Sequence, residues 1–410
     1  MSSMEYISLS DYCLSVRDGT HDTPKPVEIG KPLVTSKAID NNTIDFNQTY
    51  NISLQDFEKI NKRSLVEKWD LLMTMIGSVG RLLLVKDNPD FAIKNVALFK
   101  IGNEQKAKWM YYYLSLKQVQ DYFQLIANGT SQHFIPLKVL RKLKIENYSN
   151  QSLKIISILS KYDQLIENNN KRIKLLEQMA EELYKEWFVR FRFPGYVKIE
   201  VIDSIPSNFN IRRIDDLVAL YRGKSYSSTD IAEGSMTLLS MNNIRPFGGF
   251  LRDFSRPYNG DYREIHVLHD GDLIMCITDM TQERRVIGYV GLVTPCDKKM
   301  IACTHLIKLV PYKIDTLFLY SMFTFSSLSR DISMRSTGTN VLGLTADIIK
   351  KVKVLIPEQP LIDMYVEKVR PIFDSIKKLQ LANENLVKQR DLLLPRLMSG
   401  KIDLEGKEVI

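Results

Sequence analysis

The chain has 410 residues and a mass of 47.4 kDa, which excludes a lone small module and allows two to four domains of about 100 to 200 residues. Hydrophobic residues make up 44% and charged residues 25%, so most of the chain is expected to fold rather than remain disordered. Lys and Arg (56) exceed Asp and Glu (48), and this positive excess mildly favours a polyanionic partner.

The N-terminus shows no targeting signal, because no basic stretch leads into an apolar run of signal-peptide length. The most apolar windows, such as 71–85, are interrupted by Gly and Arg and fall short of the roughly 20 apolar residues of a membrane-spanning helix. The four cysteines include no CxxC pair and are too few for a disulfide scaffold. We therefore expect reduced thiols, a cytoplasmic location and no membrane contact.

In chain order, the sequence predicts four parts. Residues 1–148 and 196–356 carry short β-type runs separated by Gly, Asn and Pro, which are typical of mixed α and β domains. Residues 149–195 and 357–410 each contain one long helix. The predicted fold class is α+β: two tandem, pseudo-symmetric α/β-mixed domains joined by two long helices that form an antiparallel coiled coil.

Each long helix carries an apolar seam with steps of three and four residues. The first seam runs from Ile155 to Trp187, long enough to span about 50 Å. The second runs from Ile362 to Leu397, where Pro371 predicts a kink or a restart of the helix. The residues predicted to pair the helices are Ile166, Asn169, Ile173 and Leu176 in the first and Ile376, Leu379, Asn383 and Leu386 in the second.

Each seam has a polar residue near its middle, Asn169 or Asn383. Antiparallel pairing would place these two side chains opposite each other, where a buried Asn pair fixes the register at a cost in stability. The alternative is that each Asn faces solvent.

The two halves of the chain also resemble each other in sequence. Residues 127–145 align with 336–354, including Gly129-Thr130 on Gly338-Thr339. The stretch from Gly77 aligns with the stretch from Gly288, which pairs the two GxxG motifs. A duplicated domain followed by a duplicated helix is therefore expected.

No catalytic or metal site is predicted. The GKS at Gly223 lacks the first glycine of a P-loop, no GxSxG motif occurs, and the five histidines offer no matched set of metal ligands.

Polar loops followed by basic segments occur at equivalent places in both halves and suggest DNA binding. The candidate groove contacts are Thr130, Ser131, Gln132, Thr339 and Asn340. Candidate base or phosphate contacts are Arg81, Arg245, Arg284 and Arg285, and candidate phosphate contacts are Lys138, Arg141, Lys350 and Lys351.

Three strings then identify a family resemblance. ELYKEWFVRFRFPG (182–195), RDLLLPRLMSGK (390–401) and DGTHDTP (18–24) resemble the specificity subunit of type I restriction-modification enzymes. The second half lacks the DGTHDTP string and reads YRGKSYSSTDI from Tyr221, so its first loop has no match.

The resemblance implies a subunit without catalysis of its own. Each domain would read one half of a bipartite site on double-stranded DNA, and the helices would set the spacing and dock two methyltransferase subunits, joined by two endonuclease/translocase subunits. S-adenosylmethionine, ATP and Mg²⁺ are expected in those partners and no cofactor in this chain. The alternatives are a non-enzymatic coiled-coil adaptor with duplicated protein-binding domains and a self-sufficient nuclease or methyltransferase.

Overall fold

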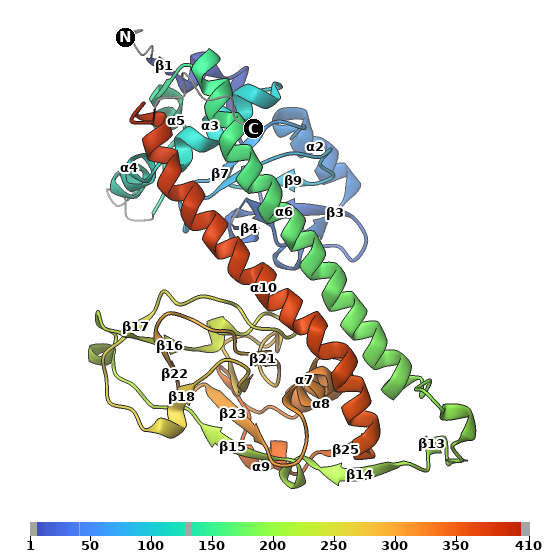
Figure 1. Ribbon diagram of the computed structural model, residues 1–410. Helices are drawn as coiled ribbons and strands as arrows, with labels where there is room; N and C mark the ends of the chain where they lie inside the picture. Colours follow the sequence, from blue (N-terminus) through green and yellow to red (C-terminus); the bar gives the residue numbers. More distant parts are fainter. Residues whose placement is uncertain (1–5, 41, 128–132, 403–410) are drawn as a thin grey trace. The chain divides into compact units, whose positions relative to one another are not determined.

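The computed structural model describes residues 6–40, 42–127 and 133–402 (Figure 1). The chain forms two compact units, one of residues 1–167 with 384–410 and one of residues 168–383. The boundary falls within two long helices, so each unit holds a β-rich part and a portion of both helices. No helix in the described ranges is long and apolar enough to cross a membrane.

A four-stranded antiparallel sheet forms the centre of the first unit. Its strands lie in the order β2 (Ser15–Asp18), β10 (Val96–Lys100), β7 (Leu71–Thr74) and β8 (Leu82–Leu84). All four side chains of β7 are buried, as expected for an inner strand. The remaining strands are the pair β1 (Tyr6–Ser8) and β11 (Lys144–Glu146), the sheet β6 (Tyr50–Ile52), β3 (Lys31–Val34) and β9 (Ala92–Ile93), and the pair β4 (Ile39–Asp40) and β5 (Thr43–Ile44).

Short helices complete this unit. They are α1 (Leu9–Tyr12), α2 (Leu54–Ser64), α3 (Glu104–Ser115), α4 (Lys117–Ala127) and α5 (Leu137–Lys142). Helix α3 begins where the side chain of Asn103 accepts a hydrogen bond from the N–H of Lys106, a standard N-cap. Its buried Trp109 and Met110 belong to the same core as the inner face of the sheet.

The second unit repeats this arrangement. Its central sheet has the order β15 (Val218–Arg222), β23 (Leu306–Pro311), β19 (Leu273–Cys276) and β21 (Val290–Leu292). A second sheet has the order β17 (Pro257–Tyr258), β16 (Met236–Leu239), β22 (Lys299–Ala302) and β18 (Val267–Leu268). The other elements are the strand pairs β12 (Val201–Ile202) with β13 (Ile205–Pro206), β14 (Phe209–Arg213) with β25 (Lys353–Pro357) and β20 (Thr278–Asp279) with β24 (Leu342–Gly343), and the helices α7 (Thr316–Phe325), α8 (Leu328–Ser333) and α9 (Ala346–Lys350).

The topology confirms the predicted duplication. Strands β2, β10, β7 and β8 correspond one by one to β15, β23, β19 and β21, and the pair β1 and β11 corresponds to β14 and β25. In the smaller sheets, β3 pairs parallel with β9 as β16 pairs parallel with β22. The chain is therefore an α+β protein built from two pseudo-symmetric tandem parts.

The structure corrects the alignment of the GxxG motifs. The N–H of Gly80 donates to the carbonyl of Thr74 (2.9 Å), and the N–H of Gly288 donates to the carbonyl of Cys276 (2.7 Å), each just after the central strand. Gly80 therefore corresponds to Gly288, not to Gly291. The sequence alignment was wrong by one glycine because the turn before the last strand differs in length between the two halves.

The two long helices are α6 (Asn150–Tyr184), which continues into a π-helical turn (Lys185–Val189), and α10 (Gln359–Met398). Helix α10 passes through Pro371 without a break, so the predicted restart is wrong. Packing explains the continuity, because the neighbouring Tyr365 and Val369 are fully buried in the core of the second unit. Tertiary burial of this kind outweighs the one helical hydrogen bond that proline removes.

Within each unit the two helices run antiparallel. In the first unit, Arg390 Nη1 lies 2.7 Å from Asp163 Oδ1. In the second unit, Asn169 Nδ2 donates to Asn383 Oδ1 (2.8 Å), the pairing that the sequence predicts, and Asn383 Nδ2 donates to Asn170 Oδ1 (2.8 Å). Of the residues predicted to pair the helices, Ile376 is buried and the others are half-buried.

Candidate nucleic-acid interface

One end of the central sheet of the first unit gathers segments that are far apart in the sequence. This end carries Gly19 and Thr20 after β2, Arg81 before β8, and residues 133–135 beside the end of β7. Those residues are held by hydrogen bonds from Ile135 N to Met75 O (3.0 Å) and from Gly77 N to His133 O (3.2 Å). Thr130, Ser131 and Gln132 lie outside the described residues. The DGTHDTP string and Arg81 thus lie at the same end of the sheet, next to its two outer strands β2 and β8.

The equivalent end of the second unit is formed by two loops that hold each other. The buried carboxylate of Asp279 accepts hydrogen bonds from Thr281 N (2.9 Å) and Val286 N (3.0 Å), which shapes the loop 280–286. Gln282 Nε2 then donates to Thr339 O (2.6 Å). Arg284 Nε donates to Ser336 Oγ (3.1 Å).

These hydrogen bonds fix the loop 336–341. Thr339 and Asn340, which the sequence predicts to contact a DNA groove, are exposed in this loop. Loops shaped by their own hydrogen bonds and ending in exposed hydroxyl and amide groups are chemically suited to reading base edges.

A glycine begins the segment that follows the first strand of the central sheet in both units, Gly19 after β2 and Gly223 after β15. A Cβ at Gly19 would lie 2.3 Å from the carbonyl oxygen of Ile93, and one at Gly223 would lie 2.1 Å from that of Cys303. Only glycine permits this approach. The segment from Tyr221, which has no counterpart by sequence, therefore occupies the place of DGTHDTP.

The charges at the two sheet ends differ. In the first unit, Asp18 accepts from Arg63 Nη2 (2.5 Å) and lies 3.0 Å from His21 Nε2, so its carboxylate balances the charge of Arg63. In the second unit, the corresponding region holds Arg222, Lys224 and Arg256, which sequence reasoning missed. The sequence signal for Arg222 and Lys224 was the basic YRGKSY string directly after a β-type run, and Arg256 lies outside that string.

The predicted phosphate contacts lie elsewhere. Arg141 donates two hydrogen bonds to the carbonyl of Val16 (3.2 and 2.9 Å), near the start of β2. Lys350 and Lys351 precede Val352, whose carbonyl accepts from Ile214 N (3.0 Å), just before β15. In the second unit these lysines are therefore near the sheet end opposite the loops, and Arg141 takes the matching place in the first unit. Lys138 is exposed at the start of α5.

Three predicted arginines are ion-paired. Arg81 lies 3.2 Å from Asp40, Arg285 pairs with Glu283, and Arg245 lies 3.4 Å from Glu177 of α6.

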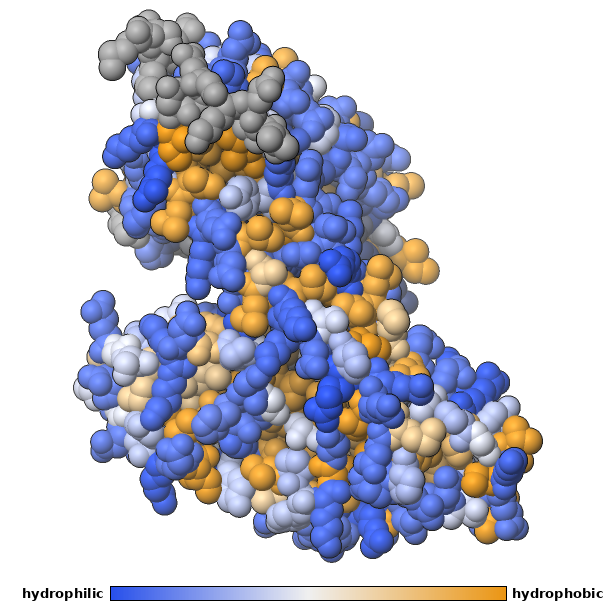
Figure 2. Space-filling view, in the orientation of Figure 1, coloured by the Kyte–Doolittle hydropathy of each residue, from blue (hydrophilic) through white to orange (hydrophobic). Residues whose placement is uncertain are grey.

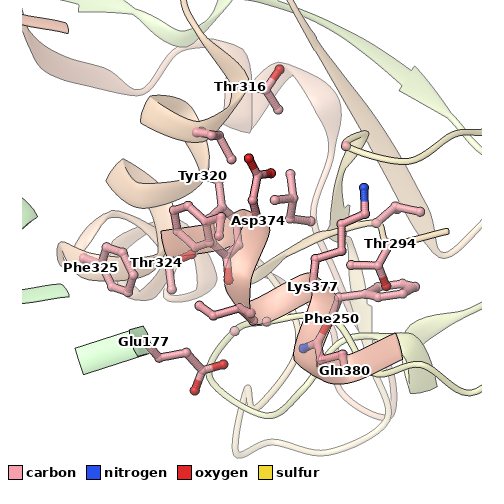
Figure 3. A pocket seen from close by; sticks show the side chains of 18 of the residues that line it. Glu177, Phe250, Thr294, Thr316, Tyr320, Thr324, Phe325, Asp374, Lys377 and Gln380 are labelled. Carbon is pink, nitrogen blue, oxygen red and sulfur yellow. The ribbon is translucent and has the colours of Figure 1, made fainter. Parts of the chain in front are cut away.

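Arg245 lines a cavity of about 700 Å³ in the second unit, between the long helices and α7 (Figure 3). Figure 3 shows Glu177, Tyr320 and Lys377 around it. Further ion pairs at its rim join Arg370 to Asp315 (2.7 Å) and Lys377 to Asp270. The position of Arg245 fits a role in holding the domain on the helices.

Comparison with known proteins gives related sequences and one related fold. No protein-family model matches the chain. The sequence is 24% identical to the type I restriction enzyme MjaVIII specificity subunit of Methanocaldococcus jannaschii, over 85% of this chain and 83% of that protein. It is 22% identical to the type I restriction enzyme HindI specificity subunit of Haemophilus influenzae, over 83% of this chain and 88% of that protein. The crystal structure of the S subunit of a type I restriction-modification system from M. genitalium matches with a TM-score of 0.51 and 16% identity and covers 97% of each chain, so the fold is shared.

Proposed function

Since this chain is a homologue of type I restriction enzyme specificity subunits, we propose that it is the DNA sequence-specificity subunit of a type I restriction-modification complex. Each β-rich domain, 1–148 and 196–356, reads one half of a bipartite DNA site. The helical parts, 149–195 and 357–410, set the distance between the halves. The observation that carries this proposal is the duplicated sheet end, where the segments that begin at Gly19 and Gly223 occupy the same place in both units.

Sequence reading is assigned to the loops and not to the basic helices. Thr339, Asn340 and Arg284 are the base-contact candidates of the second domain, and Arg81 with residues 130–132 those of the first. A bidentate contact of this kind discriminates between bases by about 1 to 3 kcal/mol. Phosphate contacts by Lys138, Arg141, Lys350 and Lys351 would add affinity without sequence preference.

Catalysis belongs to partner subunits in this proposal. Two methyltransferase subunits and two endonuclease/translocase subunits join the chain and bring S-adenosylmethionine, ATP and Mg²⁺. Apolar side chains on the outer face of α6 support docking of partners: Leu153 and Leu165 are exposed in the first unit, and Leu175 and Met179 in the second. Single exposed apolar residues are common, but their repetition along one helix indicates a covered surface. In the second unit, apolar residues also reach the surface around β12 and β13, at the lower right of Figure 2.

The proposal is tested by mapping methylated bases in DNA from cells that carry the partner genes with and without this chain. We expect methylation of one bipartite motif with a fixed gap that appears only when the chain is present. Identical methylation in both strains would contradict the proposed function. If the chain were instead a protein-binding adaptor, the complex would also lack salt-dependent binding to duplex DNA.

A further inference from the structure

The turn after β15 holds its two basic residues in fixed positions at the sheet end of the second unit. The N–H of Gly223 donates to Leu306 O (2.9 Å), and the N–H of Lys224 donates to Ala302 O (2.8 Å). The backbone on either side of Gly223 is therefore tied to the sheet. Arg222 is anchored as well, because its Nε donates to the carbonyl of Thr304 (3.2 Å).

Further cations from distant parts of the sequence meet at this turn. The guanidinium carbon of Arg256 lies 4.9 Å from the ring centre of Tyr226, a stacked position that restricts the side chain. Arg263 reaches the turn through β22 and β18. Ala302 of β22 accepts from Lys224, the preceding Ile301 pairs with Val267 of β18, and His266 just before β18 accepts at Nδ1 from the N–H of Arg263 (3.2 Å).

Within the described residues, the cations of this group lack ion-pair partners. Arg222, Lys224, Arg256 and Arg263 form no ion pair with any carboxylate among the described residues. Other cations of the same unit do, for example Arg213 with Asp215 (2.7 Å). At the equivalent place in the first unit, Asp18 neutralises Arg63.

Asp261 and Glu264 lie close to Arg263 in the sequence but form no ion pair with it among the described residues. Asp230, six residues after Lys224, accepts from the N–H of Ser227 (2.7 Å). Cations held together without counter-charges repel each other, and a bound polyanion removes that repulsion.

We propose that Arg222, Lys224, Arg256 and Arg263, called the Arg222 cluster, bind phosphate groups of duplex DNA beside the loops 280–286 and 336–341. The inference rests on the proposed function and adds a site to it. Guanidinium groups suit phosphate oxygens because they donate in a planar fork, and the lysine contributes a point charge. The contact carries no sequence information and fixes the position of the second domain on the duplex. Among the described residues of the first domain, the equivalent place holds the Arg63–Asp18 ion pair instead, so we expect the two domains to hold DNA with unequal electrostatic strength.

The test uses the complete complex with its partner subunits and a duplex that carries its methylated motif. Equilibrium binding is measured over a salt series for the unaltered chain, for Arg222→Ala/Lys224→Ala and for Lys313→Ala. Lys313 is a matched control, since it is exposed in the same unit just after β23, at the opposite end of the sheet. Each lost phosphate contact lowers the slope of log K against log salt by about 0.9. We expect the slope of the double variant to fall by up to twice this amount and the slope of the control to stay the same. The preference for the motif over a scrambled duplex should not change.

Three results separate the outcomes. If the double variant keeps the slope of the control while the unaltered complex binds its motif specifically, the Arg222 cluster is not a phosphate site and the proposed function stands. A changed sequence preference would also overturn the phosphate assignment. If the unaltered complex shows no preference for the motif, the proposed function itself fails. The variant Arg222→Lys/Lys224→Arg keeps the charge and should restore the slope, which excludes misfolding as the cause.

Discussion

Gly80 and Gly288 show how single residues shape the candidate interface. Both have left-handed backbones, with φ of +88° and +79°, and both end the turn that leads into the last strand of the sheet. A Cβ at Gly288 would lie 2.9 Å from the backbone nitrogen of Ser333 in α8, whereas Gly271, also left-handed at φ +85°, has no atom within 4 Å of its Cβ position. Gly288 and Gly271 therefore share a left-handed backbone, but a neighbouring backbone crowds the Cβ position only at Gly288.

Replacement of these glycines by alanine should separate backbone strain from steric contact. Gly271→Ala meets only the cost of a left-handed alanine, about 1 kcal/mol. Gly288→Ala meets this cost and the backbone of α8, so we expect at least twice the loss of stability in thermal unfolding. Equal melting temperatures for the two variants would show that the contact with α8 is not tight in solution.

His305 reports the electrostatic field of the Arg222 cluster. Burial first, and then the charges of Arg222 and Arg256, hold its pKa below the ordinary value. A histidine whose pKa is lowered by folding stabilises the folded state above its unfolded pKa of about 6.5, and this contribution is lost as pH falls through the folded pKa.

The variant Arg222→Ala removes one of these charges, so the pKa of His305 should rise. NMR titration of the histidine ring protons measures the shift. His269 is exposed just before β19, at the end of the sheet opposite Arg222, so it serves as the internal reference. An unchanged pKa for His305 would mean that Arg222 is fully screened and that the cations do not act together.

At the scale of the helices, charged and amide pairs set the register within each unit. Arg390 stands in the apolar seam of α10, where a lone charge would be costly, and is paired with Asp163 of α6. Asp163 also accepts from the hydroxyl of the buried Tyr112 (2.6 Å), so the network joins both helices to α3. In the second unit, Asn383 of α10 joins the two long helices through hydrogen bonds with Asn169 and Asn170 of α6.

Removal of the arginine should expose the cost of this network. Arg390→Ala leaves Asp163 without its cation, and we expect a loss of about 1 to 3 kcal/mol in thermal unfolding. Arg396→Ala, an exposed arginine in the same helix and unit, should change little. Asp163→Asn in the Arg390→Ala background should recover part of the loss because no unpaired carboxylate remains. If Arg390→Ala unfolds like Arg396→Ala, the pair does not stabilise the seam.

Helical elements were predictable from sequence because their signal is periodic and local. Steps of three and four residues located both long helices and the facing asparagines. The restart at Pro371 was a local inference that tertiary burial overrode. The turn before the last strand was misaligned because GxxG motifs occur in many turns, and the hydrogen bonds to Thr74 and Cys276 that define equivalence are not visible in a sequence.

For the molecule as a whole, the duplication could be predicted and the interface only in part. The segments 128–134 and 336–341 were predicted as contacts through their similarity to each other, and residues 128–132 lie outside the described part of the chain. Arg222, Lys224 and Arg256 were missed because they lie in different strands and loops and meet only through the topology of two sheets. Conversely, the basic residues of α5 and α9 stand out in the sequence, yet Arg141, Lys350 and Lys351 lie away from the loops.

The central claim is that each domain reads one half of a DNA site independently. The most direct measurement is sequencing of methylated bases in cells whose complex carries Thr339→Ala/Asn340→Ala in the second domain. We expect one half of the bipartite motif to become relaxed or lost, while the other half and the gap between them stay the same. A simultaneous change in both halves, or an unaltered motif, would contradict it.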